Sequence, residues 1–209
     1  VAEESALYAG EGASEADFEK ALAEMYLTRE IYDYINRVSM LYDRAYTEKF
    51  GRQGEHLSDE EIASFVEENA YITAKHILIK TVDAANQPLE GQDLAEKTAR
   101  ATLLYSQLQE VQGDREALLA KFDELMTEYT EDPGTQAYPN GYTFKPGEMV
   151  DEFQTGAEAL EDYAFSEPVQ SQIGYHIILR LPTTRDSVVD YIDGTNDNTV
   201  GAYAAADVF

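Results

Sequence analysis

The sequence predicts an α+β protein, in which a small, mainly antiparallel, four-stranded sheet is surrounded by helices and joined to an all-α helical region. Four short segments have the character of strands and are separated by helical patterns: 72–80, 142–144, 165–169 and 174–181. Strands and helices arranged in this way, with a tight turn at Gly174, indicate one α+β domain. We therefore expect a helical region at 1–70, the α+β domain at 71–182 and a helical tail at 183–209.

The N-terminal region shows helical spacing only. Residues 14–17 (Ser-Glu-Ala-Asp) have the spacing of a capping box, and apolar residues then recur at three- and four-residue steps over 18–42. We expect one long amphipathic helix here, ended by Gly51, and a shorter helix that begins with a second box at 58–61. Amphipathic helices bury their apolar faces against another surface. This region is therefore suited to packing on the tail, to holding apolar peptide or to forming a homodimer.

Helices are also expected between the strands and in the tail. Five segments have this character: 92–110, 115–129, 150–163, 187–192 and 200–209. A turn at Asp193-Gly194 separates the last two. The sequence stops at an apolar residue without a cap, so we expect the natural protein to continue.

Composition excludes several classes of function. The chain has 209 residues and a formal net charge of −26, which repels phosphate backbones and anionic lipid and argues against nucleic-acid binding. It has no cysteine, which excludes disulfides and thiol chemistry. No apolar run approaches the ~20 residues that span a bilayer. The first residues also lack the profile of a signal peptide.

Two predicted strands carry a histidine in nearly the same setting. His76 lies in Ala-Lys-His-Ile-Leu-Ile and His176 lies in Gly-Tyr-His-Ile-Ile-Leu, a hundred residues later. A polar imidazole within an apolar strand needs a partner, because an unpaired buried polar group is costly. If the two strands are neighbours in one sheet, the two imidazoles can meet. This pairing is the first indication of a site.

Five motifs link the middle of the chain to a known family. They are 74–80 (AKHILIK), 129–132 (YTED), 146–153 (PGEMVDEF), 166–169 (SEPV) and 174–180 (GYHIILR). In order and spacing they resemble the parvulin-type peptidyl-prolyl cis/trans isomerases, and the resemblance covers about 72–182. The flanking helical segment resembles the N-terminal region of PrsA- and SurA-like extracytoplasmic foldases.

The resemblance implies a polar cluster of His76, His176 and Asp132, with Ser171 at a position where the family often has a hydroxyl. A purely structural role is the alternative for the two histidines, which then form a hydrogen-bonded pair that fixes the sheet. Asp132 has an alternative role too, because Glu-Asp-Pro-Gly is a good turn sequence.

The resemblance also implies an apolar socket for the proline ring, formed by Met149 and Phe153, four residues apart. Ordinary core packing is the alternative for this pair. The family has a leucine where this chain has Gly141, so the pocket is open on one side unless Tyr138 or Tyr142 fills the gap. If neither does, activity is expected to be low.

The resemblance thus implies a peptidyl-prolyl cis/trans isomerase and folding chaperone that acts on Xaa-Pro bonds of unfolded or exported polypeptides. A non-enzymatic holdase with a degenerate parvulin domain is the alternative. We expect no cofactor, and no metal site, because the histidines lack zinc-ligand spacing. The foldase resemblance implies an extracytoplasmic lipoprotein of a Gram-positive bacterium, tied to the membrane only by an anchor that this sequence does not include.

Overall fold

The computed structural model describes residues 14–190 and 198–208, which divide into two compact units, Val1–Arg52 and Gln53–Phe209. The domain boundaries expected near residues 70 and 182 stay a prediction. The predicted turn at Asp193-Gly194 lies outside the described residues. None of the helices within the described ranges is both long and apolar enough to cross a membrane.

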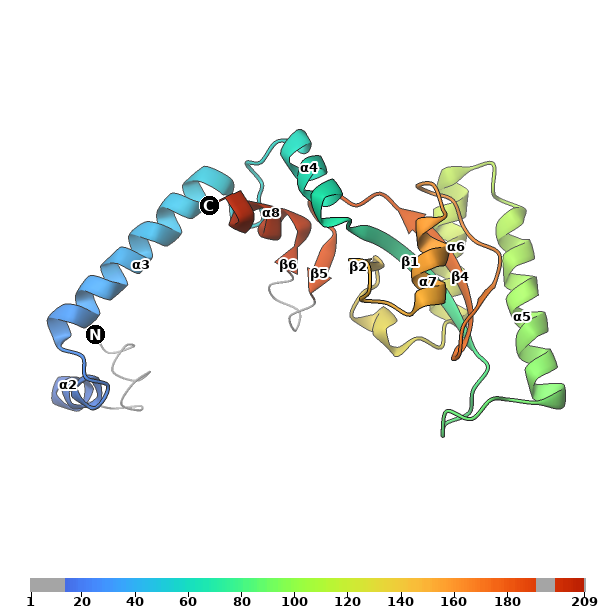
Figure 1. The fold of residues 1–209 in the computed structure, drawn as a ribbon, viewed down its shortest axis with the longest axis horizontal. Helices are drawn as coiled ribbons and strands as arrows, with labels where there is room; N and C mark the ends of the chain where they lie inside the picture. The colour runs from blue at the N-terminus through green and yellow to red at the C-terminus, as the bar shows by residue number, and fades with distance from the viewer. Residues whose placement is uncertain (1–13, 191–197, 209) are drawn as a thin grey trace. The chain divides into compact units, whose positions relative to one another are not determined.

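Within residues 14–52 the first unit contains two helices, α2 (Glu15–Glu24) and α3 (Arg29–Phe50), where the sequence predicted one (Figure 1). The capping box at Ser14 is confirmed, since its side chain accepts from the Asp17 amide and the Asp17 carboxylate accepts from the Ser14 amide. The single helix is wrong because Tyr26 adopts a left-handed conformation, with φ of 59°. Thr28 then caps a new helix by accepting a hydrogen bond from the Ile31 amide.

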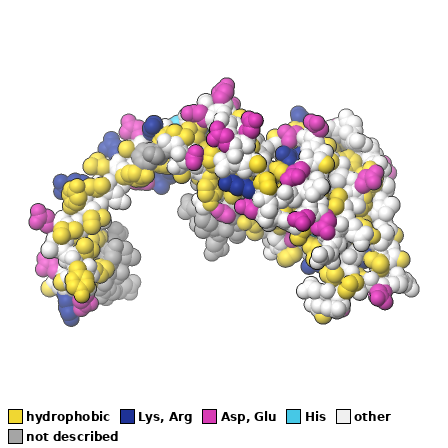
Figure 2. Space-filling model, in the orientation of Figure 1, with side chains coloured by type: hydrophobic (Ala, Val, Ile, Leu, Met, Phe, Trp, Pro, Cys, Tyr) yellow, Lys and Arg dark blue, Asp and Glu magenta, His cyan; other side chains and the backbone are white. Residues whose placement is uncertain are grey.

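One stripe of α3 is apolar and exposed. Hydrophobic side chains gather along this helix in Figure 2. The stripe recurs at three- and four-residue steps and its side chains are 46–66% exposed: Ile31, Tyr34, Ile35, Val38 and Leu41. We call these five residues the α3 stripe. Because large apolar side chains exposed in a row mark interaction surfaces, the α3 stripe is a candidate binding surface.

The second unit is built on the predicted four-stranded sheet (Figure 1). Its strands are β1 (Ile72–Lys80), β2 (Tyr142–Phe144), β3 (Val169–Gln170) and β4 (Gly174–Leu181). They lie in the order β2-β1-β4-β3, and every neighbouring pair is antiparallel. The long β1–β4 pair is the centre of the sheet, and the α+β fold class is confirmed.

Helices cover both faces of this sheet. On one face the fully buried Ile77 and Leu179 pack with residues of α5 (Gly91–Gln109) and α6 (Arg115–Tyr129). On the other face Ala74 and Ile178 pack with α7 (Asp151–Glu158). Side chains alternate along a strand, so odd-numbered residues of β1 face α5 and α6, and even-numbered residues face α7.

Three predicted elements differ from the structure. In place of the strand expected at 165–169, the structure has a single bridge from Phe165 to Leu179 and then the short strand β3. The helix expected at 150–163 ends at Glu158, the last residue of α7. The helix expected at 187–192 is wrong: Val188–Asp190 forms strand β5, which pairs with β6 (Asn198–Thr199). Consecutive β-branched valines favour a strand where a partner strand is present.

The tail is fixed to the segment that precedes β1. Helix α8 (Val200–Val208) packs on α4 (Asp59–Asn69). The Arg185 guanidinium donates to the carbonyl oxygens of Leu57, at 2.6 Å, and Glu55, at 3.3 Å. The wider prediction, that residues 183–209 pack on the whole region 1–70, stays a prediction.

Two glycines allow this contact. A Cβ atom on Gly201 would lie 2.2 Å from the Gln53 carbonyl oxygen, and one on Gly54 would lie 2.3 Å from the Gly201 carbonyl oxygen. Gly54 also has a positive φ of 72°. The backbones of tail and loop therefore approach more closely than any larger residue permits.

We predict that Gly201→Ala releases the tail, because its methyl group cannot fit against the Gln53 backbone. The expected loss is about 1–3 kcal/mol in the free energy of unfolding, together with faster proteolysis within 183–208. Urea unfolding and limited proteolysis measure the two effects. Gly113→Ala is the matched control, since a Cβ atom there meets nothing within 4 Å. Equal behaviour of the two variants would contradict the close contact.

Candidate functional site

The register of β1 and β4 brings the two histidines together. His76 lies opposite Ile178 and His176 lies opposite Leu78, so the histidines are diagonal neighbours on the α7 face. Their Nδ1 atoms are 3.0 Å apart, and the rings stack with an interplanar angle of 14°. Both side chains are buried. The predicted meeting of the imidazoles is thus confirmed as geometry.

Asp132 continues the hydrogen bonding on the His76 side. Its Oδ2 atom lies 2.9 Å from His76 Nε2 and accepts a hydrogen bond from the Tyr142 hydroxyl at 2.5 Å. Its Oδ1 atom accepts from the Gly134 amide at 3.1 Å, which caps a short 3-10 helix at Pro133–Gln136. Asp132 thus caps the predicted turn and also contacts His76, while its role in a site stays a prediction.

Two residues that the sequence did not single out hold Asp132 in place. Thr130 Oγ1 accepts from the Leu78 amide at 3.1 Å, and Glu131 Oε2 accepts from the Lys80 amide at 2.7 Å. These bonds fasten the segment before Asp132 along β1. Both residues belong to the YTED motif. Their position next to Asp132 in the sequence was the signal that could have identified them.

Ser171 continues the hydrogen bonding on the His176 side. Its Oγ atom lies 2.8 Å from His176 Nε2 and accepts from the Ile173 amide at 3.2 Å. The turn that carries Ser171 connects β3 to β4. The five side chains form one continuous series, which we call the relay: Ser171, His176, His76, Asp132 and Tyr142.

The partners of the relay fix its direction when both imidazoles are neutral. An ionised Asp132 only accepts, so His76 donates from Nε2 and accepts at Nδ1. His176 must then donate from Nδ1, which leaves its Nε2 to accept from the Ser171 hydroxyl. Every imidazole nitrogen has a partner inside the protein in this arrangement. The hydrogen-bonding groups of both imidazoles are therefore satisfied without water or substrate.

Burial and hydrogen bonding shift the acid–base properties of the relay. Burial, and then the neighbouring His76, lowers the pKa of His176 to about 4, while Asp132 opposes the shift. Burial would raise the pKa of Asp132, but hydrogen bonds from His76, Tyr142 and Gly134 hold it below its usual value. Burial, then the hydrogen bond to Asp132, raises the pKa of Tyr142. Near neutral pH, His176 is therefore neutral and Asp132 is ionised.

Apolar side chains surround the histidines. The Phe153 ring is buried, with its centre 5.0 Å from that of His76 and 5.7 Å from that of His176. Met149, half-buried, packs against the same cluster. Tyr142 lies edge-on to His76 at 5.7 Å, and Tyr138 lies 4.8 Å from Tyr142. The structure thus gathers the predicted apolar and aromatic residues around the relay.

Gly141 has a structural reason to be glycine. Its φ is 101°, and a Cβ atom there would lie 2.8 Å from the Ala74 carbonyl oxygen. A leucine does not fit this backbone. Of the two tyrosines suggested as substitutes, Tyr142 lies against His76, whereas Tyr138 reaches the relay only through Tyr142.

An opening lies at the Ser171 end of the relay. A cavity of about 350 Å³ is lined by the start of α7 and by the turn after β3: Val150, Asp151, Glu152, Ser171, Gln172 and Ile173. Val150 and Ile173 are exposed there. This opening therefore borders the Ser171 edge of the site.

We predict that His176 makes the protein less stable in acid. Its folded pKa of about 4 is below the unfolded value near 6.5, so the unfolded chain binds the proton more readily in this range. Stability is therefore lost as pH falls from 6.5 towards 4, by about 2–3 kcal/mol from this group. Urea unfolding between pH 7 and pH 4.5 measures the loss.

The variant His176→Gln should lack this part of the pH dependence, whatever its stability at pH 7. His56→Gln is the matched control for the loss of one histidine, because His56 is exposed and lies outside the relay. Parallel curves for the wild type and His176→Gln would contradict the assignment of a buried neutral imidazole.

Comparison with known proteins agrees with this geometry. Residues 76–181 match the family described as Rotamase: PPIC-type PPIASE domain. The foldase protein PrsA of Halalkalibacterium halodurans is 33% identical over an alignment of 138 residues, and the match covers 63% of this chain and 34% of that protein. The foldase protein PrsA 4 of Bacillus cereus is 29% identical over an alignment of 188 residues, and the match covers 79% of this chain and 65% of that protein. The chaperone SurA of Alkalilimnicola ehrlichii is 36% identical over an alignment of 107 residues, and the match covers 50% of this chain and 21% of that protein.

This chain spans less than two thirds of the length of each of these relatives. The family match covers just over half of the chain and contains both histidines, Asp132 and Ser171. The chain therefore belongs to the rotamase family of PPIC-type peptidyl-prolyl isomerase domains.

Proposed function

We propose that this chain is a peptidyl-prolyl cis/trans isomerase and folding chaperone that acts on Xaa-Pro bonds of unfolded or exported polypeptides. The observation that supports it most directly is the relay, which lies within the segment that matches the family and next to the apolar cluster of Phe153, Met149 and Tyr142. We call these three residues the apolar wall. The isomerase domain would be 71–182, with 1–70 as a helical chaperone-like region and 183–209 as the tail.

A non-covalent mechanism fits the relay. Rotation about an Xaa–Pro bond makes and breaks no covalent bond, but it has to overcome amide resonance, a barrier of ~18–20 kcal/mol. The imidazole nitrogens are already hydrogen-bonded to protein groups, so neither histidine is placed to act as a nucleophile. The enzyme needs only to bind the twisted amide better than the planar one, and each ~1.4 kcal/mol of preference gives about tenfold in rate.

The relay and the wall would divide this task. The polar groups of the relay are already hydrogen-bonded to each other, so they do not need to reorganise when the amide twists. Phe153 is 3% exposed and forms the base of the wall, whereas Met149 and Tyr142 are half-buried and present surface to a proline ring. His76, His176, Asp132 and Ser171 are thus proposed as the polar site, and Met149, Phe153, Tyr138 and Tyr142 as the substrate-binding residues.

A holdase function, the second candidate, is favoured by the α3 stripe. These five apolar side chains lie on a helix that carries four basic and four acidic residues, in a chain whose net charge is −26. Apolar segments of a client could therefore bind there without strong charge repulsion. A second copy of the chain could bind in the same way, which would give a homodimer through the helical region.

We also propose an extracytoplasmic location, as a lipoprotein at the surface of a Gram-positive bacterium. The resemblance to extracytoplasmic foldases supports it, and the lack of cysteine is compatible with an oxidising compartment.

The first test is NMR exchange spectroscopy on short Xaa-Pro peptides with catalytic amounts of the protein. Uncatalysed exchange takes ~10–100 s, so catalysis is seen as exchange on a much shorter time scale. We expect Met149→Ala to lower kcat/KM about tenfold or more, because the proline ring loses its apolar contact. Met40→Ala is the matched control, since Met40 is exposed on α3. His176→Ala should also lower exchange.

Activity that persists unchanged in Met149→Ala and His176→Ala would show that the pocket is wrongly assigned. No exchange with any peptide, from a wild-type sample that is folded by circular dichroism, would favour the holdase.

The holdase candidate is tested by suppression of aggregation of an unfolded client. We expect the double variant Ile35→Ser, Leu41→Ser to lose at least half of the suppression, because it removes apolar area from the α3 stripe. Met40→Ser should retain it, since Met40 lies on α3 outside the stripe. Equal suppression by both variants would exclude the stripe as the client-binding surface.

A further inference from the structure

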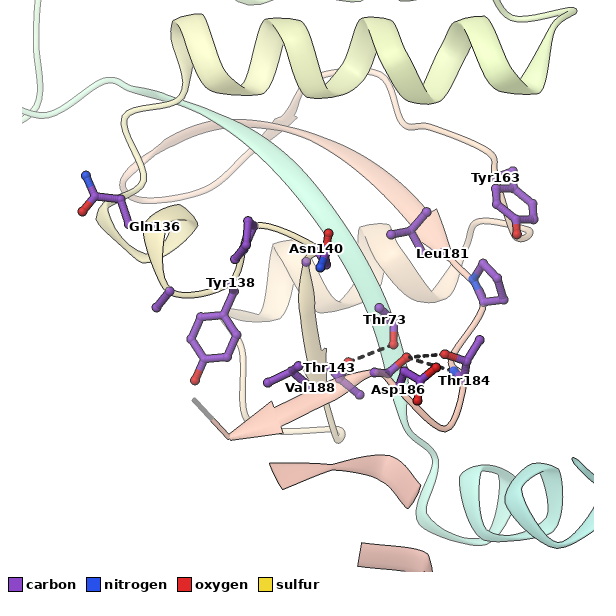
Figure 3. A pocket seen from close by; sticks show the side chains of 15 residues that line it. Thr73, Gln136, Tyr138, Asn140, Thr143, Tyr163, Leu181, Thr184, Asp186 and Val188 are labelled. Atoms are coloured by element: carbon purple, nitrogen blue, oxygen red, sulfur yellow. Dashed lines mark hydrogen bonds between the residues drawn. The ribbon is translucent and has the colours of Figure 1, made fainter. Parts of the chain in front are cut away.

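A second cavity lies beside one end of the sheet (Figure 3). Its volume is about 460 Å³, within the range of ligand-binding pockets. Thr73, Thr143 and Leu181 line it and are cross-strand partners in β1, β2 and β4. Thr73 and His76 are three positions apart on β1, so their side chains point to opposite faces.

The walls of the cavity come from two loops. One contains residues 136–141 and the other contains residues 182–188. In the second loop the Ser187 hydroxyl accepts from the Thr184 amide at 2.9 Å, which holds the turn that presents Asp186. Tyr163 also lines the cavity and has a φ of 65°, a conformation that non-glycine residues seldom adopt. The cavity is thus bounded by ordered and locally constrained backbone.

Two threonine hydroxyls of the cavity floor, those of Thr73 and Thr143, are hydrogen-bonded to each other, and Thr73 is also hydrogen-bonded to Thr183. Thr73 Oγ1 lies 3.0 Å from Thr143 Oγ1 and 3.0 Å from Thr183 Oγ1. Thr183 Oγ1 also lies 3.5 Å from the carbonyl oxygen of Tyr71. A hydroxyl oxygen has two acceptor positions, so Thr143 keeps acceptor capacity whichever atom donates in its bond to Thr73.

The charge of the lining also favours a ligand that donates hydrogen bonds. Asp186 is the only charged residue among the fifteen that line the cavity, and it is exposed. No described lysine, arginine or histidine lines it. The apolar part of the wall is provided by Pro139, Pro182 and Val188. A ligand that fits this lining is cationic, carries N–H donors and has an apolar stem; an anion would be repelled.

We propose that this cavity binds a lysine or arginine side chain of a client polypeptide. The aliphatic stem would pack on the prolines and Val188, and the charged head would donate to Asp186 and Thr143. The proposal rests on the proposed function in one respect, that the ligands of this protein are polypeptides. It adds a second contact for the client, beside one end of the sheet and lined by none of the relay residues.

The test uses the isotope-labelled full chain and two proline-free peptides of about eight residues, long enough to cross a cavity of this size. One has a single central lysine and the other has Nε-acetyl-lysine, which keeps the stem and removes the charge. Two-dimensional NMR titration should show that the lysine peptide shifts the amide signals of Asn140, Gly141 and Val188. Asp186→Asn should weaken binding about two- to fivefold, as for an exposed ion pair. Thr143→Val should weaken it as well.

Asp93→Asn is the matched control, because it changes the net charge equally and Asp93 does not line the cavity. Equal loss in Asp186→Asn and Asp93→Asn, equal binding of the two peptides, or signal shifts confined to other residues would overturn the proposal. Failure of the proposed function looks different: the protein would bind lysine peptide in the cavity but catalyse no Xaa-Pro exchange. Exchange without lysine binding would overturn the cavity alone.

Discussion

The register of β1 against β4 is the constraint on which the site depends. Side chains alternate along each strand, so a slip of one residue would move His76 or His176 to the face covered by α5 and α6. The same slip would place apolar core residues against polar ones. Burial of both faces therefore fixes the register, and the register in turn fixes the 3.0 Å contact between the imidazoles.

The buried imidazoles also explain where two loops lie. Each histidine has a second ring nitrogen that would be left unsatisfied in the core, at a cost of about 1–3 kcal/mol per group. Asp132 satisfies one from the loop after α6, and Ser171 satisfies the other from the turn after β3. The polar series is thus a structural requirement of two buried histidines, and it brings the loops of the site to the sheet.

Local patterns predicted much of this arrangement. Strands 72–80, 142–144 and 174–181 and the helix at 115–129 have the expected bounds, because each has a clear period and a clear end. The break before α3 was missed because a capping threonine at Thr28 lies inside a continuous apolar pattern. Strand β5 was missed because it and its partner β6 are only three and two residues long. Thr130 was missed because its role depends on the Leu78 amide, which is distant in the sequence. Non-local partners leave little trace in a sequence.

Gly141 shows how the second cavity and the relay are joined. Its positive φ and its close approach to the Ala74 carbonyl let the chain turn tightly at the edge of the sheet. Tyr138, before the turn, lines the second cavity, while Tyr142, after it, donates to Asp132. The two tyrosine rings still lie 4.8 Å apart. A side chain at position 141 would therefore disturb both the cavity and the relay, which is a physical reason for the departure from leucine at this position.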